Sequence, residues 1–439
     1  MMSKLKLRLR RLVMIFDIAP ITTLVEFNPS RTIKKGTVVP FIEMASLPTS
    51  HRDIGIIAEK EFNGGGAKFK NGDTLFARIT PCLENGKTAQ VQGLPEGTFG
   101  FGSTEFIVMS AKLPEYDKDY VYYLARLPEF RIYAQTHMEG TSGRQRVPWQ
   151  SLAKFEYRFP PKEGRKSAAS FLKMLDKKIA SNTAMNQTLE KIALRIFKSW
   201  FIDFDPVKAN KEGVAFDGLS PEIQALFPSE FEESEVGVIP KGWKVQSLSK
   251  TANFLNGLAC QKYPPVSQDD ALPVIKIAEM RSGYTQKTNE ASSTVNSKYI
   301  IKSGDFLFSW SGSLTTCYWG HSIGILNQHL FKVTSDIYPQ WFYAHWVNYH
   351  LGEFIRIAAD KATTMGHIKR GHLDEAKVLV PSQDILVAGS RVIAPLINKL
   401  IQNQENTRSL IDIRDRFLPK LISGQITVGE AQKELAEAI

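Results

Sequence analysis

The chain has few cysteines and no long apolar run. Only three of its 439 residues are cysteine, and Cys82, Cys260 and Cys317 lie far apart, without a Cys-x-x-Cys pair. This spacing argues against a disulfide framework or a structural zinc site and is typical of a reducing compartment. No apolar run approaches the roughly 18–20 residues that span a bilayer. We therefore expect a cytoplasmic protein without a membrane partner.

The sequence also lacks the motifs of common catalytic sites. It has no Gly-x-Ser-x-Gly elbow, no carboxylate–lysine cluster suited to a metal-dependent nuclease, and no Asn/Asp-Pro-Pro-aromatic tetrapeptide of the amino-methyltransferase type. Asn85–Thr88 suggests a phosphate loop, but Pro81 stands where that motif needs its first glycine. Two pairs of histidines are spaced by five residues, which suits neither face of a helix, so we expect no metal site. Together these absences favour a binding protein over an enzyme.

Charge is biased towards the basic side. Lysine and arginine total 55 against 45 acidic residues, a formal net charge of +10, and 43% of the chain is hydrophobic. The hydrophobic content supports packed cores, and the basic excess favours a polyanionic partner, nucleic acid before an anionic membrane. The basic stretch 4–11 has no clean signal cleavage site after it. A short edge strand, a basic arm and a frayed terminus all remain open for it.

The strongest pattern present is a repeated helix. Apolar residues recur at alternating spacings of three and four from Leu172 to Trp200, and the pattern returns 221 residues later. This spacing is the seam of a coiled coil, and two such helices in one chain can pair with each other. The predicted seam comprises Leu172, Leu175, Ile179, Asn182, Leu189, Ile196, Trp200, Ile393, Leu396, Leu400, Asn403, Leu410, Phe417 and Leu421.

Two features of the helices have open interpretations. Asn182 and Asn403 lie among apolar seam residues, where they either fix the register or mark a gap in a short seam. An aromatic cluster, Phe197, Trp200, Phe201 and Phe204, ends the first helix and suits core packing or the docking of a partner subunit.

The duplication extends to a larger module before each helix. Lys70–Phe76 resembles Lys302–Phe308, with a Gly-Asp turn in each. Runs rich in β-branched and aromatic residues predict strands at Thr37–Glu43, Thr74–Ile79, Glu105–Met109, Phe155–Phe159, Leu272–Ile277, Phe306–Trp310, His329–Val333 and Lys377–Val380. Helices are predicted at Lys118–Gln135 and Pro339–Ala358. Each module is thus mixed α+β with a mostly β body.

These patterns divide the chain into five segments. The first long helix is predicted from about Lys166 to Phe201, ~50 Å at ~1.5 Å per residue. Four prolines and an acidic run mark the segment after it as a linker. The predicted boundaries are 1–162 for the first module, 163–205 for the first long helix, 206–242 for the linker, 243–384 for the second module and 385–439 for the second long helix and tail.

Basic and polar loops occur at equivalent places in both modules. Thr141–Arg146 in the first module corresponds to a loop ending at Arg370 in the second. Arginine and glutamine can read base edges, and lysine, serine and threonine suit phosphates, although solvated loops look alike. The candidate DNA-binding residues are Lys68, Lys70, Arg78, Lys87, Arg144, Gln145, Arg146, Arg281, Trp310, Ser311, His367, Lys369 and Arg370.

Four segments together resemble the specificity (S) subunit of type I restriction-modification systems. They are Glu235–Trp243, Asn256–Leu258 followed by Tyr263–Pro265, Leu326–Val333, and Leu418–Gly424 with its counterpart Phe197–Phe201. The resemblance covers essentially the whole chain and agrees with the duplicated layout. The basic stretch before Asp17 has no match in the family, so its role stays open.

The resemblance implies a non-catalytic subunit. Each module would be a target recognition domain that reads one half of a split, asymmetric double-stranded DNA site. The long helices would form an antiparallel coiled coil that separates the two domains and sets the spacing. Two modification (methyltransferase) subunits would methylate an adenine in each half, and restriction subunits would cleave DNA. S-adenosylmethionine, ATP and Mg would be bound by these partners and none by this chain. A helical scaffold without DNA readout, or a nuclease or methyltransferase, remains the alternative.

Overall fold

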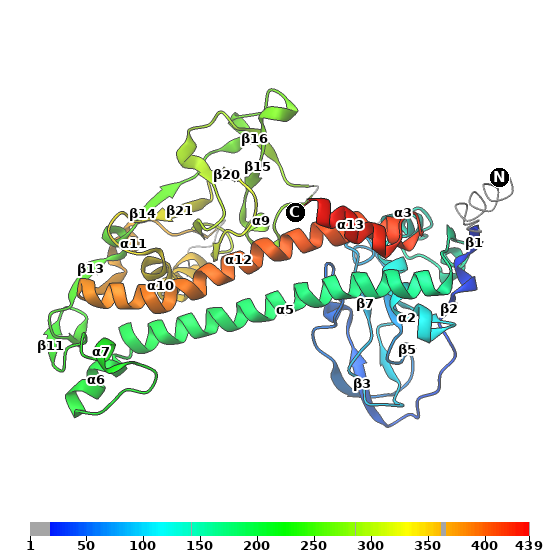
Figure 1. The fold of residues 1–439 in the computed structure, drawn as a ribbon, viewed down its shortest axis with the longest axis horizontal. Helices are drawn as coiled ribbons and strands as arrows, with labels where there is room; N and C mark the ends of the chain where they lie inside the picture. Colours follow the sequence, from blue (N-terminus) through cyan, green and yellow to red (C-terminus); the bar gives the residue numbers. More distant parts are fainter. Residues whose placement is uncertain (1–17, 142, 286, 361–365, 439) are drawn as a thin grey trace, which may run out of the picture. The chain divides into compact units, whose positions relative to one another are not determined.

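The computed structural model describes residues 18–141, 143–285, 287–360 and 366–438 (Figure 1). Its contacts divide the chain into unit 1, Met1–Ala180 with Ser409–Ile439, and unit 2, Ser181–Arg408. Each unit holds one β-rich module and a stretch of each long helix. The basic stretch 4–11 lies outside the described residues. Among those residues, no helix is long and apolar enough to cross a membrane.

The described residues of unit 1 form three sheets, with strand orders β1-β10, β2-β9-β6-β7 and β4-β3-β8-β5. Its neighbouring strands are antiparallel except for the parallel pair β3–β8. The strands are β1 (Ile18–Pro20), β2 (Val25–Phe27), β3 (Val38–Ile42), β4 (Ala58–Glu61), β5 (Ala67–Phe69), β6 (Thr74–Ala77), β7 (Thr88–Gln90), β8 (Gly100–Gly102), β9 (Phe106–Ala111) and β10 (Glu156–Arg158).

Unit 2 repeats this topology. Its sheets β13-β22, β14-β21-β18-β19 and β16-β15-β20-β17 match those of unit 1 strand for strand, and β15–β20 is again a parallel pair. The strands are β13 (Lys244–Ser247), β14 (Asn253–Asn256), β15 (Ala271–Ile275), β16 (Glu290–Ser292), β17 (Ile300–Ile301), β18 (Phe306–Ser309), β19 (Thr316–Tyr318), β20 (Gly324–Leu326), β21 (Leu330–Thr334) and β22 (Lys377–Val380). All eight predicted strands are confirmed, because each overlaps a strand of unit 1 or unit 2.

The helix predicted at Lys118–Gln135 is broken into two helices, so its predicted continuity was wrong. The segment expected as a single helix forms α2 (Pro114–Ala125) and α3 (Pro128–Thr136). Pro128 lacks an amide hydrogen and disfavours helical backbone in the residue before it, so it starts a new helix. The other expected helix is α10 (Gln340–Asp360). Short helices complete the modules: α4 (Trp149–Leu152), α8 (Leu248–Thr251), α9 (Ile277–Ser282) and α11 (Arg370–Glu375).

The segment 206–242, expected as a linker, is folded. It contains α7 (Pro221–Gln224) and the hairpin β11–β12, and α6 (Asp205–Glu212) overlaps its start. Val207 and Phe227 are buried in the same core as Trp200. Two of the prolines taken as linker signals stand in the first turn of a helix, where proline is well tolerated. The hairpin strands are β11 (Phe231–Ser234) and β12 (Gly237–Pro240).

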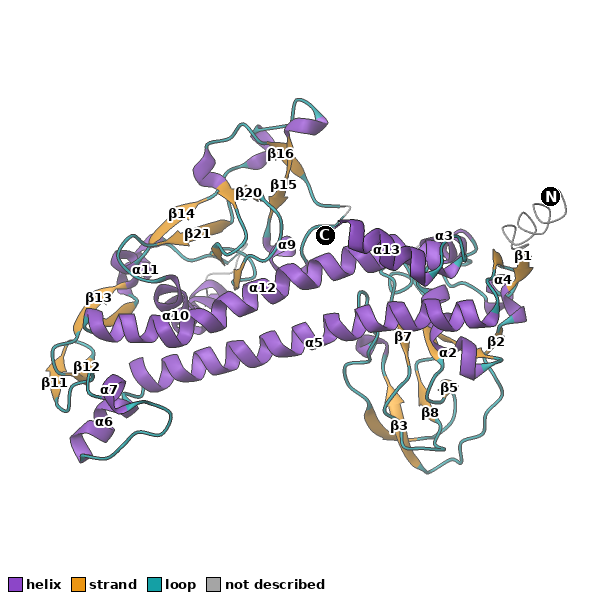
Figure 2. Ribbon diagram, viewed as in Figure 1, coloured by secondary structure: helices purple, strands orange, loops and turns teal. Residues whose placement is uncertain are grey.

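Both long helices run unbroken for 40 residues, α5 (Lys162–Phe201) and α12 (Gln383–Ile422), and α13 (Val428–Ala438) follows (Figure 2). In each unit a stretch of α5 packs on a stretch of α12, as the fold prediction required. Ten predicted seam residues are buried: Leu172, Leu175, Ile179, Asn182, Trp200, Ile393, Leu400, Asn403, Phe417 and Leu421. Four are half-buried: Leu189, Ile196, Leu396 and Leu410.

A polar layer crosses the seam in unit 2. The Asn182 side chain donates to Thr407 Oγ1 at 3.3 Å, and the Asn403 side chain donates to Asn186 Oδ1 at 3.0 Å. Asn186 also donates to the Leu400 carbonyl at 3.1 Å. Rising numbers in α5 meet falling numbers in α12, so the helices are antiparallel. Adding the 221-residue offset to Asn182 gives Asn403, and subtracting it from Thr407 gives Asn186. The two hydrogen bonds therefore join equivalent residue pairs, as two-fold symmetry requires.

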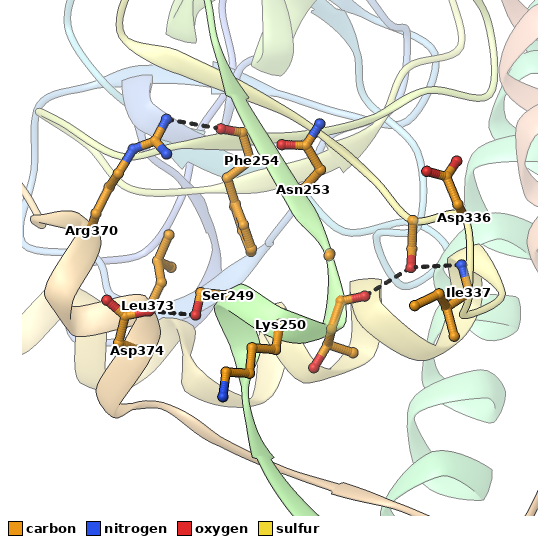
Figure 3. A pocket seen from close by; sticks show the side chains of 12 residues that line it. Ser249, Lys250, Asn253, Phe254, Asp336, Ile337, Arg370, Leu373 and Asp374 are labelled. Atoms are coloured by element: carbon orange, nitrogen blue, oxygen red, sulfur yellow. Dashed lines mark hydrogen bonds between the residues drawn. The ribbon is translucent and has the colours of Figure 1, made fainter.

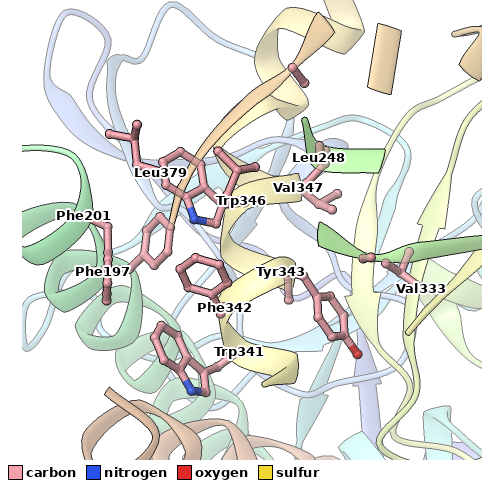
Figure 4. Packing of buried hydrophobic residues seen from close by; sticks show 14 of the residues in the cluster. Phe197, Phe201, Leu248, Val333, Trp341, Phe342, Tyr343, Trp346, Val347 and Leu379 are labelled. Atoms are coloured by element: carbon pink, nitrogen blue, oxygen red, sulfur yellow. The ribbon is translucent and has the colours of Figure 1, made fainter. Parts of the chain in front are cut away.

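Each module is fastened to the helices differently. In unit 2, Phe197 of α5 meets Trp346 of α10 at 5.4 Å between ring centroids, and Phe201 meets Trp341 at 5.6 Å (Figure 4). The aromatic cluster predicted at the end of the first helix is therefore core.

In unit 1, buried ion pairs add to the apolar contacts between the module and the helices. Arg165 of α5 binds the fully buried Asp117 of α2 through two bonds of 2.6 and 3.1 Å. Asp176 of α5 joins Arg414 of α12 at 2.9 Å and the Tyr123 hydroxyl of α2 at 2.6 Å. Buried ions are costly unless paired, so these partners depend on one another.

We predict that Asn403→Ala destabilises the chain by about 1–3 kcal/mol, because it removes a buried side chain from the polar layer and takes away the donor to the half-buried Asn186 Oδ1. Urea unfolding measures this change. Exchanging the exposed Asn406 for alanine is the matched control and should change stability by under ~0.5 kcal/mol. Equal losses for the two variants would contradict a role for the layer.

Acid should destabilise unit 2 through His345. Burial lowers the pKa of His345, which stacks on Phe197 at 5.0 Å, from 6.5 to about 4. Its neutral form is favoured in the folded state, so stability holds above pH 6.5 and falls as pH drops towards 4. The loss is at most about 3 kcal/mol. His345→Phe should unfold with a shallower pH dependence between pH 7 and 4.5, and an unchanged slope would refute this assignment.

Candidate nucleic-acid interface

A glycine–aspartate turn precedes the central strand of each module, and its own carboxylate holds it. Asp73 accepts a hydrogen bond from the Lys70 amide at 2.8 Å, and Asp305 makes the same bond with the amide three residues before it. Arg31 forms a buried ion pair with Asp73, and Lys332 lies 2.7 Å from Asp305. Both carboxylates are therefore neutralised by cations within their module.

Basic residues of the first module gather at one cavity. Lys68, Arg78 and Arg31 line a cavity of about 410 Å³ beside β6 and β9. Lys68 donates to the Arg31 carbonyl at 2.9 Å, and Arg78 Nε is buried without a hydrogen-bond partner among the described residues. Lys70 is exposed on the turn, and Lys87 donates to a backbone carbonyl at 2.7 Å, so neither lines this cavity.

A further arginine, from the loop 139–147, pairs with Glu105, the residue just before β9. Arg146 donates from Nε and Nη2 to the Glu105 carboxylate at 2.7–3.0 Å, and these hydrogen bonds raise the pKa of the arginine. Arg144 is exposed and Gln145 is half-buried. Ser142 lies outside the described residues.

The corresponding place in the second module is aromatic. Trp310 Nε1 donates to Asn256 Oδ1 at 3.0 Å, and the Ser311 hydroxyl lies 2.7 Å from His329 Nδ1. The indole centroid is 6.3 Å from the His329 ring and 6.2 Å from the His367 ring. Candidate residues predicted separately thus form one cluster of hydrogen-bonding rings.

The remaining candidates of the second module lie elsewhere. Arg370 lines a cavity of about 510 Å³ and donates to the Phe254 carbonyl at 3.5 Å (Figure 3). Lys369 is exposed beside it, and Arg281 is exposed on α9. Residues 361–365 of the candidate loop lie outside the described residues.

Four neighbours of these candidates were missed from the sequence: Arg31, Glu105, Asn256 and His329. Glu105 and His329 each begin a predicted strand, and the two strands correspond in the duplication. That correspondence is the signal that could have identified both residues. Nothing local marks Arg31, because its partner Asp73 is 42 positions away.

The described cysteines and possible metal ligands bear on what chemistry the chain can carry out. Burial raises the pKa of Cys317 to about 12 and raises that of Cys260, so both thiols stay protonated at neutral pH. Across the described part of the chain, no group of three or more His, Cys, Asp or Glu residues could hold a metal ion.

No family model matches the chain. The chain is 25% identical over 405 residues to the type I restriction enzyme HindI specificity subunit of Haemophilus influenzae, covering 81% of this chain and 87% of that protein. It is 27% identical over 327 residues to the MjaIX specificity subunit of Methanocaldococcus jannaschii, covering 71% and 70%.

The fold has a counterpart among solved structures. The crystal structure of the type I restriction-modification S subunit from M. genitalium superposes with a TM-score of 0.56 at 14% identity, covering 94% of this chain and 97% of that one. That likeness concerns the fold, and the sequence similarity concerns most of the chain's length. The chain is thus similar over most of its length to type I restriction-modification specificity subunits, and it shares the fold of a solved S subunit.

Proposed function

We propose that this chain is the DNA-specificity subunit of a type I restriction-modification complex. Each module reads one half of a bipartite, asymmetric double-stranded site, and partner subunits methylate an adenine in each half or cleave the DNA. The observation that carries the proposal is that both modules have the same β topology. Their side chains differ at the equivalent strand ends. The net charge of +10 supports contacts with phosphates.

The chemistry belongs to partners in this proposal. Two modification subunits bind S-adenosylmethionine, and restriction subunits bind ATP and Mg, while this chain binds none of them. The complex acts in the cytoplasm, where the DNA is. The protonated thiols and the neutralised turn carboxylates support a non-catalytic role, because nucleophiles and general bases need accessible unprotonated groups.

Purifying the chain with its methyltransferase partner and sequencing the methylated adenines of random DNA tests the proposal. A bipartite consensus with two different halves is expected, and methylation without one would contradict it. A scaffold that does not touch DNA predicts no electrophoretic shift, whereas we expect a shift that weakens with salt. Turnover by the isolated chain would instead support an enzyme.

A matched insertion in the helices should change only the spacing between the half-sites. We add one heptad after Leu189 in α5 and another before Leu400 in α12. Because these positions lie opposite each other, the seam residues of the two helices stay in register. Each helix lengthens by about 10 Å, so the spacer should grow by about three base pairs.

Methylation sequencing of this variant should return both halves unchanged. The control is the α5 insertion alone, which puts the helices out of register and should abolish methylation at the bipartite site. An unchanged spacer in the matched variant would show that the helices do not set the distance.

A further inference from the structure

Three residues of the first module meet through backbone hydrogen bonds. The Arg78 amide, just after β6, donates to the carbonyl of Glu105, just before β9, at 3.0 Å. The Val147 amide donates to the Arg78 carbonyl at 2.9 Å, and Ile79 forms a bridge with Arg146. This lattice holds Arg78, Glu105 and Arg146 at one strand end.

The second module contains the same lattice. The Trp310 amide, just after β18, donates to the carbonyl of His329, just before β21, at 3.2 Å. The Ile368 amide donates to the Trp310 carbonyl at 3.0 Å, and Ser311 forms a bridge with His367. Trp310, His329 and His367 therefore occupy the places of Arg78, Glu105 and Arg146.

The side chains on this lattice have no chemistry in common. The first set has two guanidinium groups and one carboxylate, and the second has an indole and two imidazoles. The second module makes the same backbone bonds with two imidazoles, His329 and His367, in the places of Glu105 and Arg146. The bond between Arg146 and Glu105 is therefore not what docks the loop. A partly exposed ion pair is worth only about 0–1 kcal/mol. The Arg146 side chain is 42% exposed, so it can exchange its partner for a ligand.

We propose that these two sets are base-reading triads, one in each recognition module, an inference that rests on the proposed function. The first triad is residues 78, 105 and 146, and the second is residues 310, 329 and 367. Each backbone lattice presents its triad in the same way, and the side chains alone decide which base pair is accepted.

The chemistry of each triad indicates its base pair. Arginine binds O6 and N7 of guanine through two hydrogen bonds, and glutamate accepts from N4 of cytosine. The first triad can supply both from neighbouring residues, so it selects a G·C pair. The second triad offers a large apolar ring in Trp310, which suits the thymine methyl group, and it has no carboxylate for cytosine. It therefore selects an A·T pair.

The test sequences adenines methylated in random DNA by the complex with its methyltransferase partner. Glu105→Gln and Arg146→Ala should each lower the preference for G·C at one position of the first half-site by about 5–150-fold. The second half-site consensus, read on the same molecules, should not change, and its retention shows that the complex is folded. The matched control Lys154→Ala removes an exposed cation of the same module and should leave both halves unchanged.

The reverse exchange tests the second triad. Replacing Trp310 by Arg, His329 by Glu and His367 by Arg should create a G·C preference in the second half while the first stays constant. Trp310→Ala is a milder variant and should reduce the preference for A·T there. A bipartite wild-type consensus that these variants leave intact would overturn the triads alone. A wild type without such a consensus would overturn the proposed function.

Discussion

The pairing of α5 with α12 is the constraint on which the rest of the structure depends. Its polar layer is self-complementary, since the bond between Asn182 and Thr407 has its symmetry mate between Asn403 and Asn186. A slip of either helix would break both bonds and bury four unpaired polar side chains. Symmetry of this kind is usual between identical subunits and here acts within one duplicated chain. It explains why insertions accumulated in the modules while the helices kept a constant offset.

The two modules solve the same packing problem with different chemistry. Polar bonds from Asp117 to Arg165 and from Tyr123 to Asp176 add to the apolar contacts of the first module with the helices, whereas Phe197 and Phe201 contact tryptophans of the second. A buried ion pair tolerates little change in either partner, while an aromatic cluster can be repacked at lower cost. The duplicated modules have therefore diverged in their cores as well as at their strand ends.

Periodic patterns predicted much of this fold, and contacts distant in sequence account for what was missed. The seam follows a local repeat of three to four residues, and the strands follow local runs of β-branched and aromatic residues, both of which the sequence displays directly. The break at Pro128 and the helices at Pro206 and Pro221 were missed because proline both ends and begins helices. At the strand ends, Arg78 and Arg146 could be proposed from residue type. The meeting of Arg146 with Glu105 required a tertiary contact across 41 positions.

Equivalent backbone bonds beneath unlike side chains explain how one duplicated fold can recognise an asymmetric target. The bond from Arg78 to Glu105 recurs between Trp310 and His329, so the loop conformation does not depend on the side chains it displays. Recognition residues can then change without loss of the fold, because loops on a rigid scaffold tolerate substitution. The opposite holds on the seam, where Asn403 must match Asn186 directly. The strand-end side chains can therefore differ between the modules on equivalent backbone bonds, whereas the residues of the polar layer must match each other.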